Sequence, residues 1–233
     1  MTTAHDVVPH DAWIEARTAL LAKEKEFTRL RDELSQARRD LPWEPVEKDY
    51  VFDGPDGPHS LADLFAGRSQ LIVYHFMWPP DWEAGCLHCS FWADNFDPII
   101  VHLKHRDVTM VAVSRAGPAQ IAAYKERMGW SFDWYSSADD YTADLGVHFT
   151  REQAEQGGFF NYRTAPPGFT DREGMSVFFK DADGAVFHTY SAYARGIDMF
   201  NTAYHYLDTV PNGRDEAAGN QHWVRRHDEY EVG

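Results

Sequence analysis

The chain has 233 residues, of which 43% are hydrophobic, 15% aromatic and 25% charged, values that suit a globular protein with a substantial core. The 37 acidic residues outnumber the 22 basic ones, which gives a formal net charge of −15. A surface this acidic repels phosphate groups, so we expect neither nucleic acid nor an anionic membrane as a partner.

A helical extension at residues 1–45 is predicted to precede a main domain at residues 46–210 and a polar tail at residues 211–233. Within the extension, apolar side chains recur at helical spacing over residues 11–39, and Pro42 ends the pattern. Asp11 is the expected N-cap of this helix. The apolar stripe serves either to pack on the main domain or to meet a second copy. We expect the helix and the tail to build a homodimer.

Strands and helices alternate in the main domain. Continuous apolar runs at residues 71–76 and 108–113 predict two strands that are buried on both faces. A crossover helix is expected at residues 118–128, a short strand at 133–135, an antiparallel hairpin at 176–190 and a final helix at 196–207, whereas residues 142–169 lack a regular pattern. Parallel strands with right-handed crossovers and an added hairpin form the thioredoxin topology. We therefore expect a thioredoxin-like α/β fold, with a central mixed sheet flanked by helices.

Two cysteines, Cys86 and Cys89, lie where the first buried strand gives way to a helix. We expect a cytoplasmic protein, because the N-terminus lacks the basic cap and apolar stretch of a signal peptide and no apolar run approaches the ~18 residues of a membrane span. The cytoplasm keeps thiols reduced, so a single Cys-x-x-Cys pair favours redox or metal chemistry over a structural disulfide.

The position of the pair indicates how it would react. The N–H groups and the dipole at a helix N-terminus stabilise a thiolate at Cys86, whose pKa we expect to fall from ~8.5 into the range of ~3.5–7.5. Cys86 is then expected to be the exposed, attacking thiolate, and Cys89 is the resolving thiol one helical turn away. His88, between them, adds positive charge that stabilises the thiolate and makes the pair a stronger oxidant.

Several longer segments resemble a bacterial thioredoxin-like family of unknown function: residues 75–82, 85–94, 177–181, 188–196, 204–208 and 213–216. They include the Cys-x-x-Cys pair and the His-Thr-Tyr-Ser-Ala-Tyr run that begins at His188. The resemblance covers nearly the whole chain. It implies a thioredoxin fold related to alkyl hydroperoxide reductases, without implying a particular substrate.

Two departures from better-known relatives bear on the reaction. Thioredoxins carry a proline before the strand that faces the cysteines, whereas this chain has Glu173 there, which argues against disulfide exchange with proteins. Peroxiredoxins carry a hydroxyl residue between a proline and the cysteine. Pro79 and Cys86 fit that spacing, but Glu83 stands at the hydroxyl position, and its carboxylate is expected to raise the pKa of Cys86. Arg195 is the candidate for the arginine that activates peroxide in those enzymes.

A metal site is the alternative use of the cysteines. His75, at the end of the first buried strand, and His188, on the hairpin, are the histidines placed to join Cys86 and Cys89. Two thiolates with imidazoles suit copper or zinc. Sco-type copper chaperones, also thioredoxin-like, bind copper in this way, an analogy at the level of the fold. His75 and His188 serve equally well as core histidines that bond to the backbone.

Aromatic residues near these elements are candidates either for the walls of a substrate pocket beside the cysteines or for the core: Trp78, Trp82, Tyr190 and Tyr193. The sequence predicts a thiol-dependent oxidoreductase that acts on a small molecule or a peroxide through the cysteine pair, with His88 and Arg195 assisting and no cofactor required. The alternatives are a metal-binding thioredoxin-like protein and a redox-sensing module without turnover.

Overall fold

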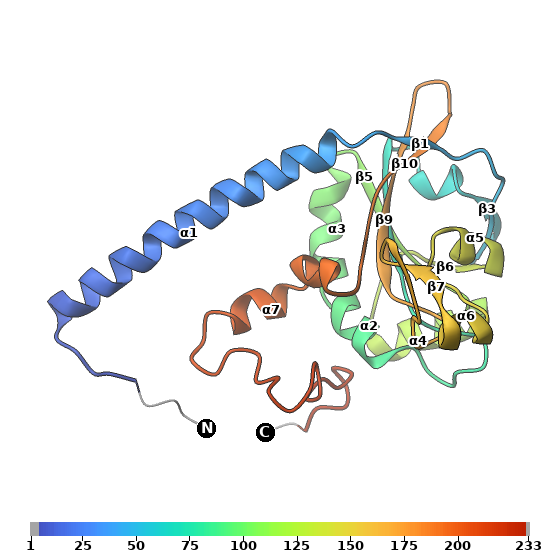
Figure 1. Ribbon diagram of the computed structural model, residues 1–233. Helices are drawn as coiled ribbons and strands as arrows, with labels where there is room; N and C mark the ends of the chain where they lie inside the picture. The colour runs from blue at the N-terminus through green and yellow to red at the C-terminus, as the bar shows by residue number, and fades with distance from the viewer. Residues whose placement is uncertain (1–4, 232–233) are drawn as a thin grey trace. The chain divides into compact units, whose positions relative to one another are not determined.

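The computed structural model describes residues 5–231, and the chain divides between Pro42 and Trp43 into two compact units. The first unit is one long helix, α1 (His10–Arg39), which confirms the predicted helix (Figure 1). The helix begins at His10 with Pro9 as its N-cap, so Asp11 lies in the first turn and does not cap it. Within α1 itself no side chain is buried.

The second unit holds the remaining elements (Figure 1). Its strands are β1 (Glu44–Pro45), β2 (Val51–Gly54), β3 (Gly57–Ser60), β4 (Gln70–His75), β5 (Val108–Ser114), β6 (Trp134–Ser137), β7 (Gly158–Phe160), β8 (Arg163–Ala165), β9 (Gly174–Lys180) and β10 (Val186–Tyr193). Its helices are η1 (Asp63–Phe65), α2 (Leu87–Ala93), α3 (Phe96–Lys104), α4 (Pro118–Met128), α5 (Asp139–Asp144), α6 (Arg151–Gln156), η2 (Ala194–Phe200) and α7 (Thr202–Leu207). Among residues 5–231 no helix has both the length and the apolar character that a bilayer span needs.

Eight of these strands form one mixed sheet in the order β1-β10-β9-β4-β5-β6-β2-β3. Strands β4, β5 and β6 are parallel, whereas β9 runs antiparallel to β4, and β10 runs antiparallel to β9. The parallel strands are joined by helical crossovers, and the β9–β10 hairpin completes the sheet on the other side of β4. This is the thioredoxin-like arrangement that the sequence predicts, with the central mixed sheet confirmed.

The sheet separates two hydrophobic clusters, because successive residues of a strand point to opposite faces. On one face, Tyr74 of β4 packs with residues of α2, α3 and α4. On the other face, Val73 of β4 packs with residues of η1 and α5. Figure 1 shows α2 and α3 on one side of the sheet and α5 on the other. Neighbouring residues of one strand therefore serve two different sides of the domain.

Two stretches differ from the sequence-based expectation. The final helix is interrupted at Asn201, whose side chain accepts hydrogen bonds from the N–H groups of Ala203 at 3.1 Å and Tyr204 at 3.4 Å and so starts α7 as a separate helix. Residues 142–169, which show no regular pattern, contain α6 and the small β7–β8 hairpin. The Asn201 cap depends on a single polar side chain, so the spacing of apolar residues does not predict it.

Candidate active site

The two cysteines lie at the start of α2, after the loop that leaves the central strand β4. The Cys86 N–H donates to the carbonyl of Met77 at 3.1 Å, and the Met77 N–H donates to the sulfur of Cys89 at 3.4 Å. The loop thus folds back on itself beside the thiols. A Cβ atom at Gly85 would lie 2.8 Å from the ring of Phe76, so a glycine is needed where the loop passes this ring.

Both thiols are free, with Cys86 9% exposed and Cys89 2% exposed. The expectation of an exposed Cys86 is wrong, because both thiols are buried in the wall of a cavity. Hydrogen bonding by the Cys89 thiol holds the pKa of Cys86 well below its ordinary value, and His88 and the Cys89 backbone N–H act in the same direction against burial. Burial raises the pKa of Cys89 well above its ordinary value, and the neighbouring Cys86 raises it further. The pair therefore combines a thiolate with a protonated thiol.

The two charged neighbours expected to act on Cys86 are placed differently. Hydrogen bonding to Cys86 raises the pKa of His88, so the imidazolium and the thiolate stabilise each other. Glu83 is exposed to solvent, and it is not among the described residues that line the cavity beside the cysteines. The expectation that Glu83 raises the pKa of Cys86 is wrong, because the carboxylate is screened by water and the Cys86 pKa falls.

A cavity of about 630 Å³ opens beside the pair. Its walls come from β4, from the loop before α2, from α2 itself, from the segment before β9, from η2 and from the C-terminal tail. These side chains are among them: Tyr74, Trp82, Trp92, Arg172, Glu173, Arg195, Gln221 and Arg226. Trp82 and Arg195 are expected members, and Arg195 pairs with Asp198 at 3.3 Å. Arginine and aromatic side chains thus surround the thiols.

Tyr74 and Glu173 are site residues that the sequence-based assignment misses. Burial raises the pKa of Tyr74 well above its ordinary value, and the nearby Cys89 raises it further, so the phenol stays protonated. Burial also raises the pKa of Glu173, against the opposing effect of Arg172, whose guanidinium lies 3.2 Å from its carboxylate. A signal for Glu173 exists in the sequence, since it stands just before the strand that faces the cysteines.

The C-terminal tail supplies part of the cavity wall. Arg226 donates to the carbonyl of Gly85 at 2.8 Å and to the hydroxyl of Tyr124 at 2.7 Å. The Tyr124 hydroxyl bonds to Ser90 of α2 at 2.9 Å, and Ser90 donates to the carbonyl of Cys86, also at 2.9 Å. These contacts link the tail directly to Gly85 and, through Tyr124 and Ser90, to Cys86.

Over residues 2–230 the chain matches a family described as a bacterial protein of unknown function, DUF899. It belongs to that family. No curated protein matches this DUF899 protein.

Solved structures similar to this DUF899 protein include two peroxiredoxins and one Sco protein. Peroxidoxin BcpB from Mycobacterium tuberculosis is 14% identical with a TM-score of 0.44, over 69% of this chain and 93% of its own. PrxQ from Xylella fastidiosa is 10% identical with a TM-score of 0.43, over 72% and 96%. BsSco, a member of the Sco family of cytochrome c oxidase assembly proteins, is 14% identical with a TM-score of 0.42, over 69% and 92%.

Three of the aromatic residues singled out in the sequence lie outside the cysteine cavity of the DUF899 protein. Trp78 is buried in the core, where its indole N–H donates to the carbonyl of Trp82 at 3.1 Å. Tyr190 packs at the edge of the same core cluster. Tyr193 lines a different cavity and donates to the carbonyl of Leu145 at 2.8 Å. Of the four, only Trp82 lines the cavity beside the cysteines.

The structure does not bring together the metal ligands considered above. His75 bonds to the hydroxyl of Ser176 at 2.8 Å, and His188 bonds to that of Ser191 at 2.7 Å. Within residues 5–231 no three His, Cys, Asp or Glu side chains converge so that they could hold a metal ion. The reason is strand geometry: Tyr74 faces the cysteines, so the next residue, His75, points to the opposite face of the sheet.

Proposed function

We propose that the protein is a thiol-dependent oxidoreductase in which Cys86 attacks a small peroxide and Cys89 resolves the product. The observation that supports this most directly is the opposite displacement of the two thiol pKa values beside one cavity. A low-pKa thiolate is the nucleophile at neutral pH, and a high-pKa neighbour keeps the proton that a leaving group needs.

The reaction has two balanced steps. The Cys86 thiolate attacks one peroxide oxygen, the O–O bond breaks, and the leaving alkoxide or hydroxide takes up a proton, so that Cys86 becomes a sulfenic acid and the peroxide becomes an alcohol or water. The Cys89 sulfur, having lost its proton, then attacks the Cys86 sulfur and releases water, which leaves a disulfide. An external dithiol returns the pair to the reduced state by exchange.

Two neighbouring groups are suited to the proton transfers in these steps. Glu173 lies half-buried in the cavity wall, and burial raises the pKa of its carboxyl, which favours a proton on this group. It can donate that proton to the leaving oxygen and take one from Cys89 afterwards. Arg195 lines the same cavity with an exposed side chain and is available to bind an anionic group of the substrate.

The test is a single-turnover reaction of the reduced protein with hydrogen peroxide and with cumene hydroperoxide. We expect loss of both thiols, formation of one intramolecular disulfide, and a change in tryptophan fluorescence from Trp82 and Trp92 in the cavity wall. The Cys89→Ser variant should stop at the sulfenic acid, which dimedone traps and mass spectrometry locates on Cys86. The Cys86→Ser variant should consume no peroxide.

A matched control uses Ser131→Ala, because Ser131 is an exposed hydroxyl residue that does not line the cysteine cavity. Peroxide consumption that persists in Cys86→Ser at the wild-type rate would exclude Cys86 as the nucleophile. Two free thiols in the wild-type protein after prolonged exposure to either peroxide would exclude the proposed cycle as a whole.

A further inference from the structure

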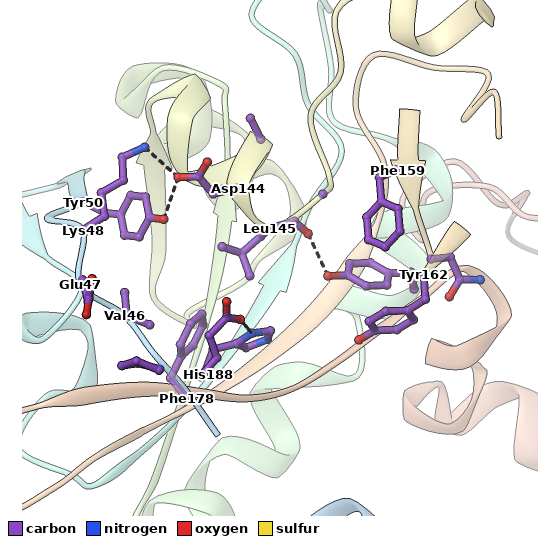
Figure 2. A pocket seen from close by; sticks show the side chains of 16 residues that line it. Val46, Glu47, Lys48, Tyr50, Asp144, Leu145, Phe159, Tyr162, Phe178 and His188 are labelled. Atoms are coloured by element: carbon purple, nitrogen blue, oxygen red, sulfur yellow. Dashed lines mark hydrogen bonds and ion pairs between the residues drawn. The ribbon is translucent and has the colours of Figure 1, made fainter. Parts of the chain in front are cut away.

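A second cavity, of about 490 Å³, lies on the other side of the sheet from the cysteines. Its floor includes Phe178, which belongs to the hydrophobic cluster opposite the one that contains both thiols. Figure 2 shows Phe159 and Tyr162 at one side of this cavity and Tyr50 and Asp144 at the other, with Phe178 and His188 between them. The proposed redox chemistry uses none of these side chains.

Each tyrosine of this cavity donates its hydroxyl proton in a hydrogen bond to another group of the protein. Tyr50 donates to the Asp144 carboxylate at 2.8 Å, Tyr162 to the carbonyl of Ser191 at 3.0 Å, and Tyr193 to the carbonyl of Leu145 at 2.8 Å. Their rings, with those of Phe159 and Phe178, give the lining an aromatic π surface beside its aliphatic and acidic side chains. Such surface attracts cations through the negative face of each ring.

One aromatic wall is held in place at a conformational cost. Asn161 and Tyr162 form the turn between β7 and β8 with φ values of 50° and 61°. A bulky residue such as tyrosine rarely adopts this left-handed conformation. Tyr162 is held by its hydrogen bond to Ser191 and by its contact with Tyr193, whose ring centroid lies 5.9 Å away.

Carboxylates dominate the charge of the cavity. Lys48, the one lysine or arginine in its described lining, is already paired with Asp144 at 2.7 Å and with Asp140 at 3.2 Å. Among the described residues, Glu44 pairs only with the imidazole of His188, at 3.6 Å, and Glu47 has no ion-pair partner. Two carboxylates are thus left without a strong cationic partner beside an aromatic surface.

We propose that this cavity binds an organic cation, an ammonium group carried on an apolar body. Aromatic faces with nearby carboxylates are the environment in which a desolvated ammonium ion is most stable. The volume exceeds what a bare ammonium needs and lies in the range of small-molecule sites. The net charge of −15 adds a long-range attraction for cations.

The experiment compares choline with 3,3-dimethylbutan-1-ol, which has the same shape without the charge, by titration calorimetry on the full chain. We expect choline to bind at least about tenfold more tightly than the neutral alcohol, and benzyltrimethylammonium to bind more tightly than choline. Phe159→Ala removes a ring that is 62% exposed, so the variant should still fold. It should lower the affinity for both cations at least about threefold. Glu44→Gln combined with Glu47→Gln should do the same.

The matched controls are Tyr206→Ala, an exposed aromatic residue outside the cavity, and Glu155→Gln, an exposed glutamate of α6; neither should change the affinity. Cys86→Ser should also leave it unchanged, which keeps this test independent of the proposed redox function. The proposal would be overturned if the neutral alcohol bound as tightly as choline or if phenylacetate bound more tightly. It would also be overturned if Phe159→Ala had no effect, or if neither cation bound at about 20 mM.

Discussion

Arg226 donates a hydrogen bond to the carbonyl of Gly85 over 2.8 Å, which ties the C-terminal tail to the residue directly before Cys86. The same guanidinium bonds to the Tyr124 hydroxyl at 2.7 Å and to Glu229 at 3.0 Å. A single tail residue thus joins the loop, α4 and the tail itself. This contact helps to hold the wall that the tail adds to the cysteine cavity, together with the ion pairs of Arg127 with Asp228 and Glu229.

Replacing Arg226 with Gln should loosen the tail and expose the thiols. Hydrogen bonds from charged groups contribute about 1.5–3 kcal/mol each, so part of that stabilisation is lost. We expect faster cleavage of the tail by thermolysin, a protease that does not require the arginine for cleavage. We also expect faster alkylation of Cys86. Arg225→Gln is the matched control, because the Arg225 guanidinium bonds to the carbonyls of His222 and Val224, which both belong to the tail. Equal rates in both variants would show that the tail is held elsewhere.

The alkylation rate of Cys86 should rise with pH well below the ordinary thiol range near pH 8.5. Because the Cys89 thiol is the largest stabiliser of the Cys86 thiolate, Cys89→Ala should raise the midpoint more than His88→Ala does. In Cys86→Ser, the remaining Cys89 should react only above the ordinary range. The measurement is the rate of iodoacetamide labelling against pH, and a common midpoint near 8.5 would contradict it.

Glu173→Gln should lower the pKa of both Cys89 and His88, because the Glu173 charge raises each of them. The labelling profile of Cys89 in a Cys86→Ser background should therefore move to lower pH. Glu173→Asp should keep part of the pKa increase that the Glu173 charge causes. Glu152→Gln, at an exposed position of α6, should leave both pKa values unchanged. An unchanged profile in Glu173→Gln would mean that this carboxyl does not act on the thiols.

His75 should make the fold sensitive to acid. Burial, with the nearby His188, lowers the pKa of His75 to about 3. The unfolded chain binds this proton near pH 6.5 and the folded chain does not, so stability falls as the pH drops from 6.5 towards 3, by about 3 kcal/mol at pH 4. His75→Gln, which can keep the bond to Ser176, should lose less stability than the wild type between pH 7 and pH 4.

Urea unfolding at the two pH values measures this difference. The exposed His105→Gln is the control, and it should follow the wild type. An acid dependence of His75→Gln as steep as that of the wild type would assign the effect to other groups.

The α1 helix should mediate a parallel homodimer. Its apolar residues recur every seven positions, at Trp13, Leu20, Phe27 and Leu34, and all are at least 50% exposed. In a parallel pair, Glu26 and Glu33 of one helix would face Arg31 and Arg38 of the other, whereas an antiparallel pair would bring the glutamates together.

Light scattering at micromolar concentration should therefore give the mass of a dimer. Changing Glu26 and Glu33 to Arg should weaken the dimer, adding Arg31→Glu and Arg38→Glu should restore it, and Lys25→Glu, on the outer face, should leave it intact. A monomer mass for the wild type would contradict this assembly.

The sequence determined the framework of the protein through local patterns. Apolar runs fixed β4 and β5, helical spacing fixed α1 and α4, and the turn at residues 181–184 fixed the β9–β10 hairpin. The Cys-x-x-Cys spacing, after a buried strand, located Cys86 and Cys89 at the start of α2. These features depend on residues that are neighbours in the chain, so their signal can be read along it.

Only the tertiary structure decided which side chains meet. Tyr74 and His75 are adjacent in sequence, yet the alternation of strand β4 sends Tyr74 to the thiols and His75 to Ser176 on the other face. Arg226 reaches Gly85 across 141 positions, a contact that no local pattern records. The cysteine cavity and the second cavity therefore emerge only when the sheet is assembled, because each is lined by residues that are distant in the chain and share one face of it.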